Sequence, residues 1–440
     1  MANRWVLWRA AAVAVLALPT APGCSTDDGD GWLDLSGTTV EVVAVWQDAE
    51  AEAFEQVLDA FEARTGASVV LTSTEGRDIG AVLDARIAGG DVPDVAVLPQ
   101  PGLLRRYALD GAIHPLGDAL VTEVGDRYGA PWRRLATVDG DMYGVWFKAA
   151  NKSLVWYSLG AFERAGVVPP TDLDRLVEVA DALAASGTPP FAVAAAPEDS
   201  WVLTDLFENL YLRVAGPERY DALADRRVSW TDGTVVATLA LFADLLAPQN
   251  LAGGPEGALG WRLPDAAAAV FAADPAAGMI VEGDFVPGVV AGAGEAELGV
   301  DVDVMPFPER QPGGRLVVGG GDAAVLMRPE PAGEELVRFL ATAEAGEIWA
   351  ARGGFLSPNE DVDLSVYPDD RTRDVARALL EAGDGFRFDL SDLQPVEFGG
   401  TTGSGMWGIL RDLVADPADP PDVAGAAARL EAAAAAAWGA

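Results

Sequence analysis

The sequence predicts an α/β protein whose two lobes are joined by several chain segments. Two units of strand and helix fill about sixty residues after Thr39, and a second α/β region begins near Gly144. Strand-like runs then return before a final part that is helical in pattern. This order indicates a chain that crosses between two lobes more than once, so that the crossing segments form a hinge.

The first region alternates strand-like and helical segments. The β-branched run 40–45 predicts a buried parallel strand, and further strands are expected at 69–71 and 95–98. Helices are expected between the strands, because apolar residues recur there at the spacing of one helix face: Phe54, Val57, Leu58 and Phe61, then Ile79, Val82, Leu83 and Ile87. Parallel sheets of this kind bind ligands at the carboxyl ends of their strands.

The second region begins with extended segments and continues as alternating helices and strands. Helices are expected at about 173–183, 202–214 and 235–246, and strands at 191–194, 278–281, 300–305 and 316–327. From Glu334 to Trp438 the pattern predicts helices separated by Gly and Pro loops. Crossings between the lobes are expected near Lys148, Met279 and Gly320.

The first residues have the features of an export signal. Arg4 and Arg9 precede an apolar run over 10–18, which suits a signal peptide and is too short to span a bilayer. The run leads through Ala-Pro-Gly to Cys24, the only cysteine in the chain. This arrangement resembles a lipobox, in which the cysteine is acylated and becomes the mature N-terminus. Ordinary signal cleavage is the alternative.

The composition excludes several classes of partner and cofactor. With 30 basic against 68 acidic residues the net charge is −38, so a polyanion such as nucleic acid would be repelled. One cysteine and one histidine cannot build a disulfide or a thiolate metal site. We therefore expect no nucleic-acid partner, no metal and no cofactor.

Motifs for covalent catalysis are missing as well. His114 is the only histidine and precedes a proline, so no Ser-His or Cys-His arrangement can form. Ser404 lacks the full glycine pattern of a nucleophile elbow. The glycines at 319–321 are followed by Asp322, which excludes a phosphate loop. We expect no enzymatic activity, although a glycosidase pair of carboxylates stays open as an alternative.

Aromatic and polar side chains come together where strands are expected to end. Trp46, after the first strand, precedes Gln47, and Trp201 stands four residues before Asp205. Aromatic faces stack on the C–H faces of pyranose rings, while carboxylates and amides bind the hydroxyl groups. The chain has only two lysines, Lys148 and Lys152, both at the first expected crossing. Lys148 is either a ligand contact or a surface charge near a bend.

At this point the sequence resembles the extracellular solute-binding proteins of the maltose-binding type. The resemblance runs over nearly the whole mature chain and is carried by Gly90-Asp-Val-Pro-Asp-Val95, Asp139-Gly-Asp-Met-Tyr-Gly-Val145, Phe162-Glu-Arg-Ala-Gly166, Gly278-Met-Ile-Val-Glu-Gly-Asp-Phe285 and Val317-Val-Gly-Gly-Gly-Asp322. The alpha-glucoside-binding branch looks closest, on Lys148-Ala-Ala-Asn-Lys-Ser-Leu-Val-Trp-Tyr157, Gly353-Gly-Phe-Leu-Ser-Pro-Asn359 and Phe386-Arg-Phe-Asp-Leu-Ser-Asp392.

The resemblance implies a two-lobed fold like that of type II periplasmic binding proteins, with the sugar held in the cleft between the lobes. It implies ten ligand-binding residues: Trp46, Gln47, Gln100, Lys148, Trp201, Asp205, Glu282, Phe285, Asp322 and Trp407. Phe285 stands where the family commonly has tryptophan. The predicted boundaries are 1–23 for the signal peptide, 24–38 for a flexible linker after lipidated Cys24, 39–147 and 280–318 for lobe 1, and 148–279 and 319–440 for lobe 2.

The function implied is that of a monomeric extracellular lipoprotein of an ABC transporter. It would hold a sugar, an oligosaccharide or an alpha-glucoside, and deliver it to the permease subunits from the outer face of the membrane. The alternatives are a secreted glycoside hydrolase and the same binding fold with another cargo, such as a peptide or a polyamine.

Overall fold

The computed structural model describes residues 31–74, 79–290, 296–310, 314–416 and 421–439. The predicted signal peptide and Cys24 lie outside these residues. Within the described parts of the chain, no helix combines the length and the apolar character that crossing a bilayer requires.

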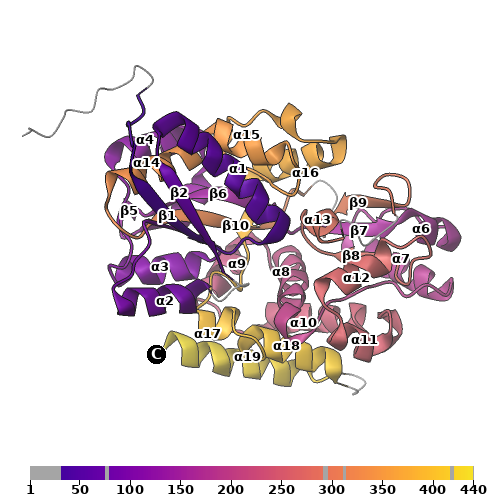
Figure 1. Ribbon diagram of the computed structural model, residues 1–440. Coiled ribbons are helices and arrows are strands. Elements are labelled where there is room, and N and C mark those ends of the chain that lie inside the picture. The colour runs from indigo at the N-terminus through magenta and orange to yellow at the C-terminus, as the bar shows by residue number, and fades with distance from the viewer. Residues whose placement is uncertain (1–30, 75–78, 291–295, 311–313, 417–420, 440) are drawn as a thin grey trace, which may run out of the picture.

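A six-stranded sheet lies at the centre of the first lobe (Figure 1). Its strands are β1 (Thr39–Ala44), β2 (Ser68–Ser73), β3 (Val95–Leu98), β6 (Gly144–Asn151), β10 (Val317–Leu326) and β11 (Phe386–Phe388). β1 pairs in parallel with β2 and β3, whereas β10 runs antiparallel to β3 and β6. β11 joins the start of β10 in parallel. Strands from late in the sequence therefore complete the sheet that the first hundred residues begin.

Helices surround this sheet. They are α1 (Asp48–Thr65), α2 (Ile79–Gly89), α3 (Pro101–Leu109), α4 (Asp118–Arg127), α5 (Ala130–Leu135), α14 (Pro331–Leu340), α15 (Ala343–Ala350) and α16 (Asp370–Glu381). α1 buries its predicted apolar face and ends at Gly66, whose φ of 74° is left-handed. A small hairpin, β4 (Thr137–Val138) and β5 (Asp141–Met142), precedes the crossing strand β6.

The second lobe contains a three-stranded antiparallel sheet. β7 (Leu154–Ser158) lies between β8 (Met279–Val281) and β9 (Val302–Pro306). Neighbouring side chains enter different hydrophobic clusters: Val155 and Tyr157 pack on one side of the sheet, and Trp156 packs on the other. This alternation is the period of a strand buried on both faces.

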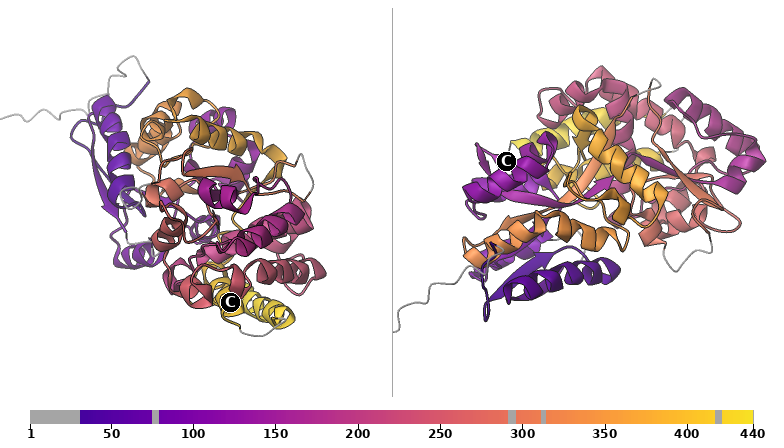
Figure 2. Two further views of the ribbon diagram at one scale, coloured as in Figure 1. Left: turned by 90° about the vertical axis from the view of Figure 1, so that its right-hand side faces the viewer. Right: turned by 90° about the horizontal axis from the view of Figure 1, so that it is seen from above.

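Eleven helices within the described residues belong to this lobe. They are α6 (Leu159–Ala165), α7 (Leu173–Ala185), α8 (Trp201–Ala215), α9 (Pro217–Ala224), α10 (Gly233–Leu245), α11 (Gly254–Gly260), α12 (Leu263–Val270), α13 (Val286–Val289), α17 (Val396–Gly399), α18 (Gly405–Ala415) and α19 (Val423–Trp438). α8 packs against α10, α18 and the crossing strand β10. Figure 2 shows α19, in yellow, beside the helices of this lobe.

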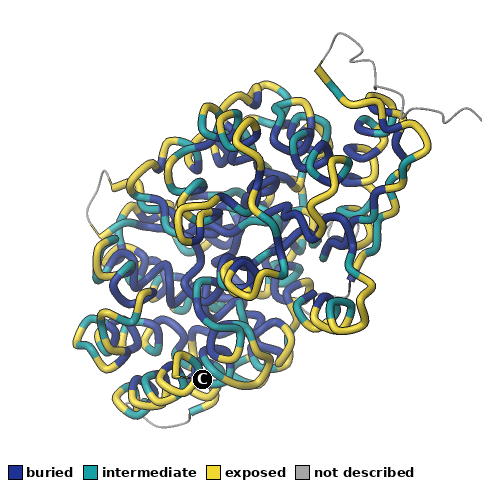
Figure 3. Tube along the Cα trace, turned by 90° about the vertical axis from the view of Figure 1, so that its left-hand side faces the viewer, coloured by how far each residue is buried: buried dark blue, intermediate teal, exposed yellow. Residues whose placement is uncertain are grey.

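The predicted fold class is confirmed: two α/β lobes are joined by several chain segments, and buried backbone runs through the middle of the molecule (Figure 3). The predicted lobe boundaries need correction. β8 and β9, at 279–281 and 302–306, pair with β7 in the second lobe, whereas 317–326 and 386–388 pair with the sheet of the first lobe. The alternation of apolar residues identifies a strand but not the sheet that it joins. The prediction therefore placed most of these strands in the wrong lobe.

The predicted linker over 24–38 also needs correction in its described part. Residues from Trp32 onward are attached to the first lobe. The backbone N–H of Leu33 donates to Glu335 Oε1 at 2.9 Å, and the Arg338 guanidinium lies 4.4 Å from the centre of the Trp32 ring. These contacts fix this part of the segment against α14.

Candidate ligand-binding site

Lys148, on the crossing strand β6, is the centre of a cluster in the first lobe. Its ammonium pairs with Glu50, in the first turn of α1, and lies 6.0 Å from the centre of the Trp46 ring and 5.1 Å from that of Trp349. The indole N–H of Trp46 donates to Asp322 Oδ2 at 3.3 Å. Three predicted site residues, Trp46, Lys148 and Asp322, are therefore brought together.

The charges in this cluster depend on one another. Burial disfavours the charged ammonium, but the carboxylates of Glu50 and Asp322 outweigh it and raise the pKa of Lys148. Burial raises the pKa of Asp322 to about 6, against the opposing charge of Lys148. The cluster thus holds one stable cation beside the Asp322 carboxyl group, which titrates below neutral pH.

The three glycines before Asp322 explain how β10 reaches this position. A Cβ at Gly319 would lie 2.4 Å from the Phe386 ring, and one at Gly321 would lie 2.5 Å from the Lys148 carbonyl oxygen. These residues are glycine because three strands pack closely there. The pairing of β10 with β6 then shifts at Asp322, a local irregularity of the kind that redirects a side chain.

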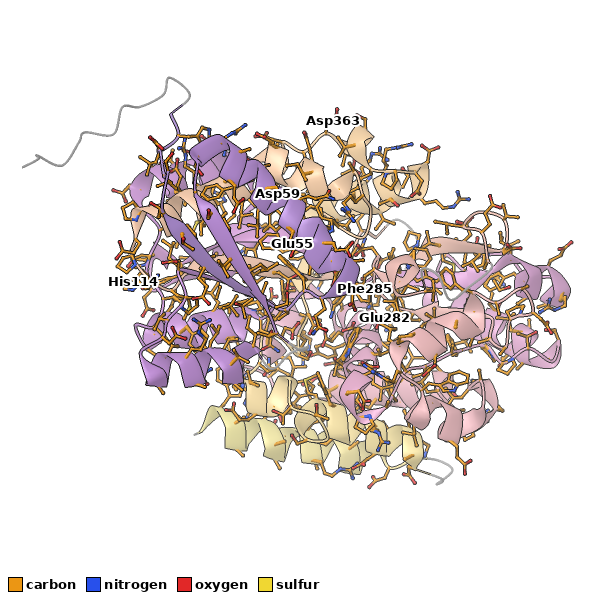
Figure 4. The ribbon with its side chains drawn as sticks, viewed as in Figure 1. Glu55, Asp59, His114, Glu282, Phe285 and Asp363 are labelled. Atoms are coloured by element: carbon orange, nitrogen blue, oxygen red, sulfur yellow. The ribbon has the colours of Figure 1, made fainter. Side chains whose placement is uncertain are left out.

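The second lobe contributes an aromatic pair to the junction between the lobes. The rings of Trp201, at the start of α8, and Phe285, after β8, are 6.1 Å apart and tilted by 56°. Both side chains are half-buried. Figure 4 places Phe285 and Glu282 between the two halves of the molecule, near the N-terminal end of α1, whereas His114 lies at the opposite edge of the first lobe.

Asp284 connects this pair to the crossing strand. Its Oδ1 accepts a hydrogen bond from the backbone N–H of Asn151 at 2.7 Å. Burial raises the pKa of Asp284 to about 6, with the charge of Lys148 opposing the rise. The aromatic pair and the Lys148 cluster therefore lie on adjoining segments where the chain passes between lobes.

Beneath Trp201 lies a buried ionic network centred on Lys152. The Lys152 Nζ is 3.0 Å from Asp205 Oδ1 and 2.5 Å from Asp389 Oδ2, and all three side chains are at most 5% exposed. The same ammonium lies 5.3 Å from the centre of the Trp201 ring. The amide of Asn209 donates to the backbone oxygens of Lys152 and Asp205, each at 2.9 Å.

The network around Lys152 contains one predicted site residue, Asp205, and two residues that were not predicted. Asp205 is 0% exposed and paired with Lys152, so it is a buried partner of Lys152 beneath Trp201. Lys152 and Asp389 were not among the predicted site residues. The sequence feature that could have pointed to Lys152 is that it is one of only two lysines in the chain. Asp389 lies 237 residues from Lys152 along the chain.

Two predicted stacking residues are core residues in this structure. Trp46 is 2% exposed and packs edge-on against Phe54 and Trp349, with ring centres 4.7 and 4.8 Å away. Trp407 is also 2% exposed and lies in the hydrophobic cluster of the second lobe. A stacking ring must present a face to its ligand, and among the predicted aromatic residues Trp201 and Phe285 are the ones that are half-buried.

The two predicted glutamines differ in exposure. Gln47 is exposed, and its side-chain amide donates to the Thr74 carbonyl at 2.8 Å. Gln100 is buried and donates to Asp392 Oδ1 at 3.1 Å. Gln47 therefore lies at the surface of the protein, whereas Gln100 holds the segment after β11 against the first lobe.

One group of carboxylates in the described residues has the spacing of a metal site. Oxygens of Asp205, Glu208 and Asp389 lie within 4.8 Å of one another. The Lys152 ammonium already pairs with two of these three side chains. The protein thus supplies its own cation at this position, and the set does not fit a metal ion.

The chain matches the family described as bacterial extracellular solute-binding protein over residues 47–347. It is 32% identical over 401 residues to the osmoprotective compounds-binding protein GgtB of Synechocystis, covering 89% of this chain and 93% of that protein. It is 30% identical over 379 residues to the alpha-glucosides-binding periplasmic protein AglE of Rhizobium meliloti, covering 83% and 82%. A solved chitin oligosaccharide binding protein shares the fold, with a TM-score of 0.74, 19% identity, and coverage of 91% of this chain and 99% of that one.

Proposed function

The chain belongs to the bacterial extracellular solute-binding proteins, and from that premise we propose that it is the sugar receptor of an ABC importer. The relatives named above are binding proteins. We propose an oligosaccharide or an alpha-glucoside as the ligand, held between the lobes and delivered to permease subunits by a monomeric receptor.

The observation that carries this proposal is the half-buried aromatic pair at the junction between the lobes. Trp201 and Phe285 present apolar ring surface beside the carboxyl groups of Asp284 and Asp322 and the ammonium of Lys148. A pyranose ring needs this combination, because its C–H faces pack on aromatic rings and its hydroxyl groups bond to charged acceptors and donors.

The name of one relative supports the choice of alpha-glucoside. AglE is an alpha-glucosides-binding protein, whereas GgtB binds osmoprotective compounds. Both cover more than four fifths of this chain. We extend the ligand class from AglE to this chain as part of the proposal.

The buried network excludes Asp205 and Glu282 as the pair of carboxyl groups that a glycoside hydrolase would need. A hydrolase needs two carboxyl groups that reach the glycosidic bond. Asp205 and Glu282 are both 0% exposed, and Asp205 is paired with Lys152. Neither is placed to protonate a leaving group.

We also propose that Cys24 is acylated and tethers the receptor to the outer face of the membrane. The docked segment at Trp32 follows eight residues after Cys24, so the tether would hold the first lobe close to the bilayer. Replacing Cys24 with Ala should release the protein from the membrane fraction. Retention of the C24A protein there would exclude this anchor.

The experiment for the main proposal is titration calorimetry against maltose, trehalose, sucrose and maltotriose, with product analysis after prolonged incubation. We expect stoichiometric binding of at least one sugar and no cleavage. Because a ligand at 100 times its Kd stabilises a protein by about 2.7 kcal/mol, a thermal shift should accompany binding. Turnover of a sugar, or binding only of peptides or polyamines, would overturn the proposal.

A further inference from the structure

The two elements that carry the aromatic pair are linked beneath it by two carboxyl groups. Asp205 follows Trp201 by one turn of α8, and Glu282 precedes Phe285 by three residues. Both carboxyl side chains are 0% exposed. Each carboxyl group changes the pKa of the other, so the two lie close together, and their proximity connects α8 to the turn after β8.

The contact between the carboxyl groups of Asp205 and Glu282 requires a proton. Asp205 Oδ1 pairs with the Lys152 ammonium at 3.0 Å, and Glu282 Oε2 accepts from the backbone N–H of Gly283 at 2.8 Å. The other two oxygens, Asp205 Oδ2 and Glu282 Oε1, receive no N–H or O–H group from the described residues. Two carboxylates repel each other, whereas a carboxylic acid and a carboxylate form a strong hydrogen bond.

The surrounding charges favour the protonated form. Lys152, from the segment after β6, is the cation that faces the pair. Asp389, from the segment after β11, and Glu208, on α8, add two further buried carboxyl groups. Four buried acids therefore surround one ammonium. Burial raises the pKa of Glu282 to about 7, against the opposing charge of Lys152, and burial also raises the pKa of Asp205 well above its usual range.

We propose that Asp205 and Glu282 share one proton, and that this proton-bridged pair is a positioning clamp that holds Trp201 and Phe285 together as one binding surface. The proposal rests on the proposed function for its ligand. Neither carboxyl group touches the ligand. The clamp acts on the two rings through the backbone elements that carry them.

The clamp makes sugar affinity depend on pH in a defined direction. The clamp is intact while Asp205 and Glu282 share the proton. It is lost as the pH rises and the pair releases that proton near neutral pH. Affinity for the sugar should therefore be highest in mildly acidic solution. Above the transition it should fall by up to tenfold per pH unit, the limit for the loss of one proton.

The test compares the wild type with two substitutions of one side chain, using maltose as the probe. In Glu282→Gln the amide donates the hydrogen bond without titrating, so its affinity should change less between pH 6 and 8 than that of the wild type, and the change that remains comes from Asp284 and Asp322. In Glu282→Ala the bond is lost, so binding should be weak at both pH values. Equal pH dependence in wild type and E282Q would overturn the clamp.

An infrared measurement on ligand-free protein separates failure of the clamp from failure of the proposed function. The wild type should show a carboxylic acid C=O band at pH 6 that disappears on titration through neutral pH and is missing in E282Q, whereas the bands of Asp284 and Asp322, whose pKa values are about 6, should remain in E282Q. Asp322→Asn serves as the matched control, because it removes another titrating carboxyl and should leave this band in place. The band would support the clamp even without maltose binding. Loss of the band in D322N, or its presence in E282Q, would overturn it.

Discussion

The two lysines of this chain lie four residues apart and occupy opposite environments. Lys148 pairs with Glu50, whose side chain is 46% exposed, at the junction between the lobes. Lys152 pairs with Asp205 and Asp389, which are 0% and 1% exposed. A cation whose partner is hydrated can exchange that partner for a ligand, whereas a cation between dry carboxylates is fixed. In the proposed function the first therefore belongs to the binding surface, and the second to its support.

The largest effect expected from this contrast is on stability. Lys152→Met leaves two buried carboxylates without their cation and should lower the free energy of unfolding by about 3–5 kcal/mol. Lys148→Met should cost less, because water can solvate Glu50 in the variant and because Asp322 and Asp284, whose pKa values are already raised to about 6, can take up protons. Chemical denaturation of both variants measures the difference. Equal losses would show that the two lysines are equivalent.

The next largest effect is expected on sugar affinity, when a ring at the junction between the lobes is removed. Trp201→Ala removes one of the two half-buried rings and should weaken sugar binding by about 1–3 kcal/mol. The control is Trp438→Ala, because Trp438 is 46% exposed on α19, outside the junction. Calorimetry of both variants, after confirming that each is folded, provides the comparison. Unchanged affinity in W201A would remove Trp201 from the site.

The smallest effect concerns the titrating carboxyl of the Lys148 cluster. The raised pKa of Asp322, about 6, means that its contribution to stability is present at low pH and is lost as pH rises through 6. Asp322→Asn should therefore stabilise the ligand-free protein by about 1 kcal/mol at pH 8 and leave it nearly unchanged at pH 4. Thermal unfolding at the two pH values measures this. Destabilisation at pH 8 would show that the charged form of Asp322 is needed.

Much of the local structure could be predicted from the sequence. The strand expected at 95–98 is β3, and the helices expected at 202–214 and 235–246 are α8 and α10, with ends shifted by one or two residues. The segment at 191–194 is an exception, because within it only Phe191 forms isolated bridges, to Leu251 and Met279. Hydrophobic periodicity reports burial, which several irregular segments share with strands.

The grouping of residues could be predicted only in part. Trp201, Phe285, Lys148 and Asp322 were named from the resemblance and lie at the junction between the lobes. The burial of Trp407 and the pairing of Lys152 with Asp389 depend on contacts between segments far apart in the chain. No local pattern records such contacts, so the supporting layer of the site became visible only in three dimensions.

The central claim is that a sugar is held at the junction between the lobes by Trp201 and Phe285. The structure of the complex with the tightest-binding sugar of the panel tests it most directly. We predict a pyranose ring packed within about 4 Å of both aromatic rings, with hydroxyl groups bonded to Asp322, Asp284 or Lys148. A sugar bound elsewhere on the molecule, or in contact with neither ring, would contradict the account.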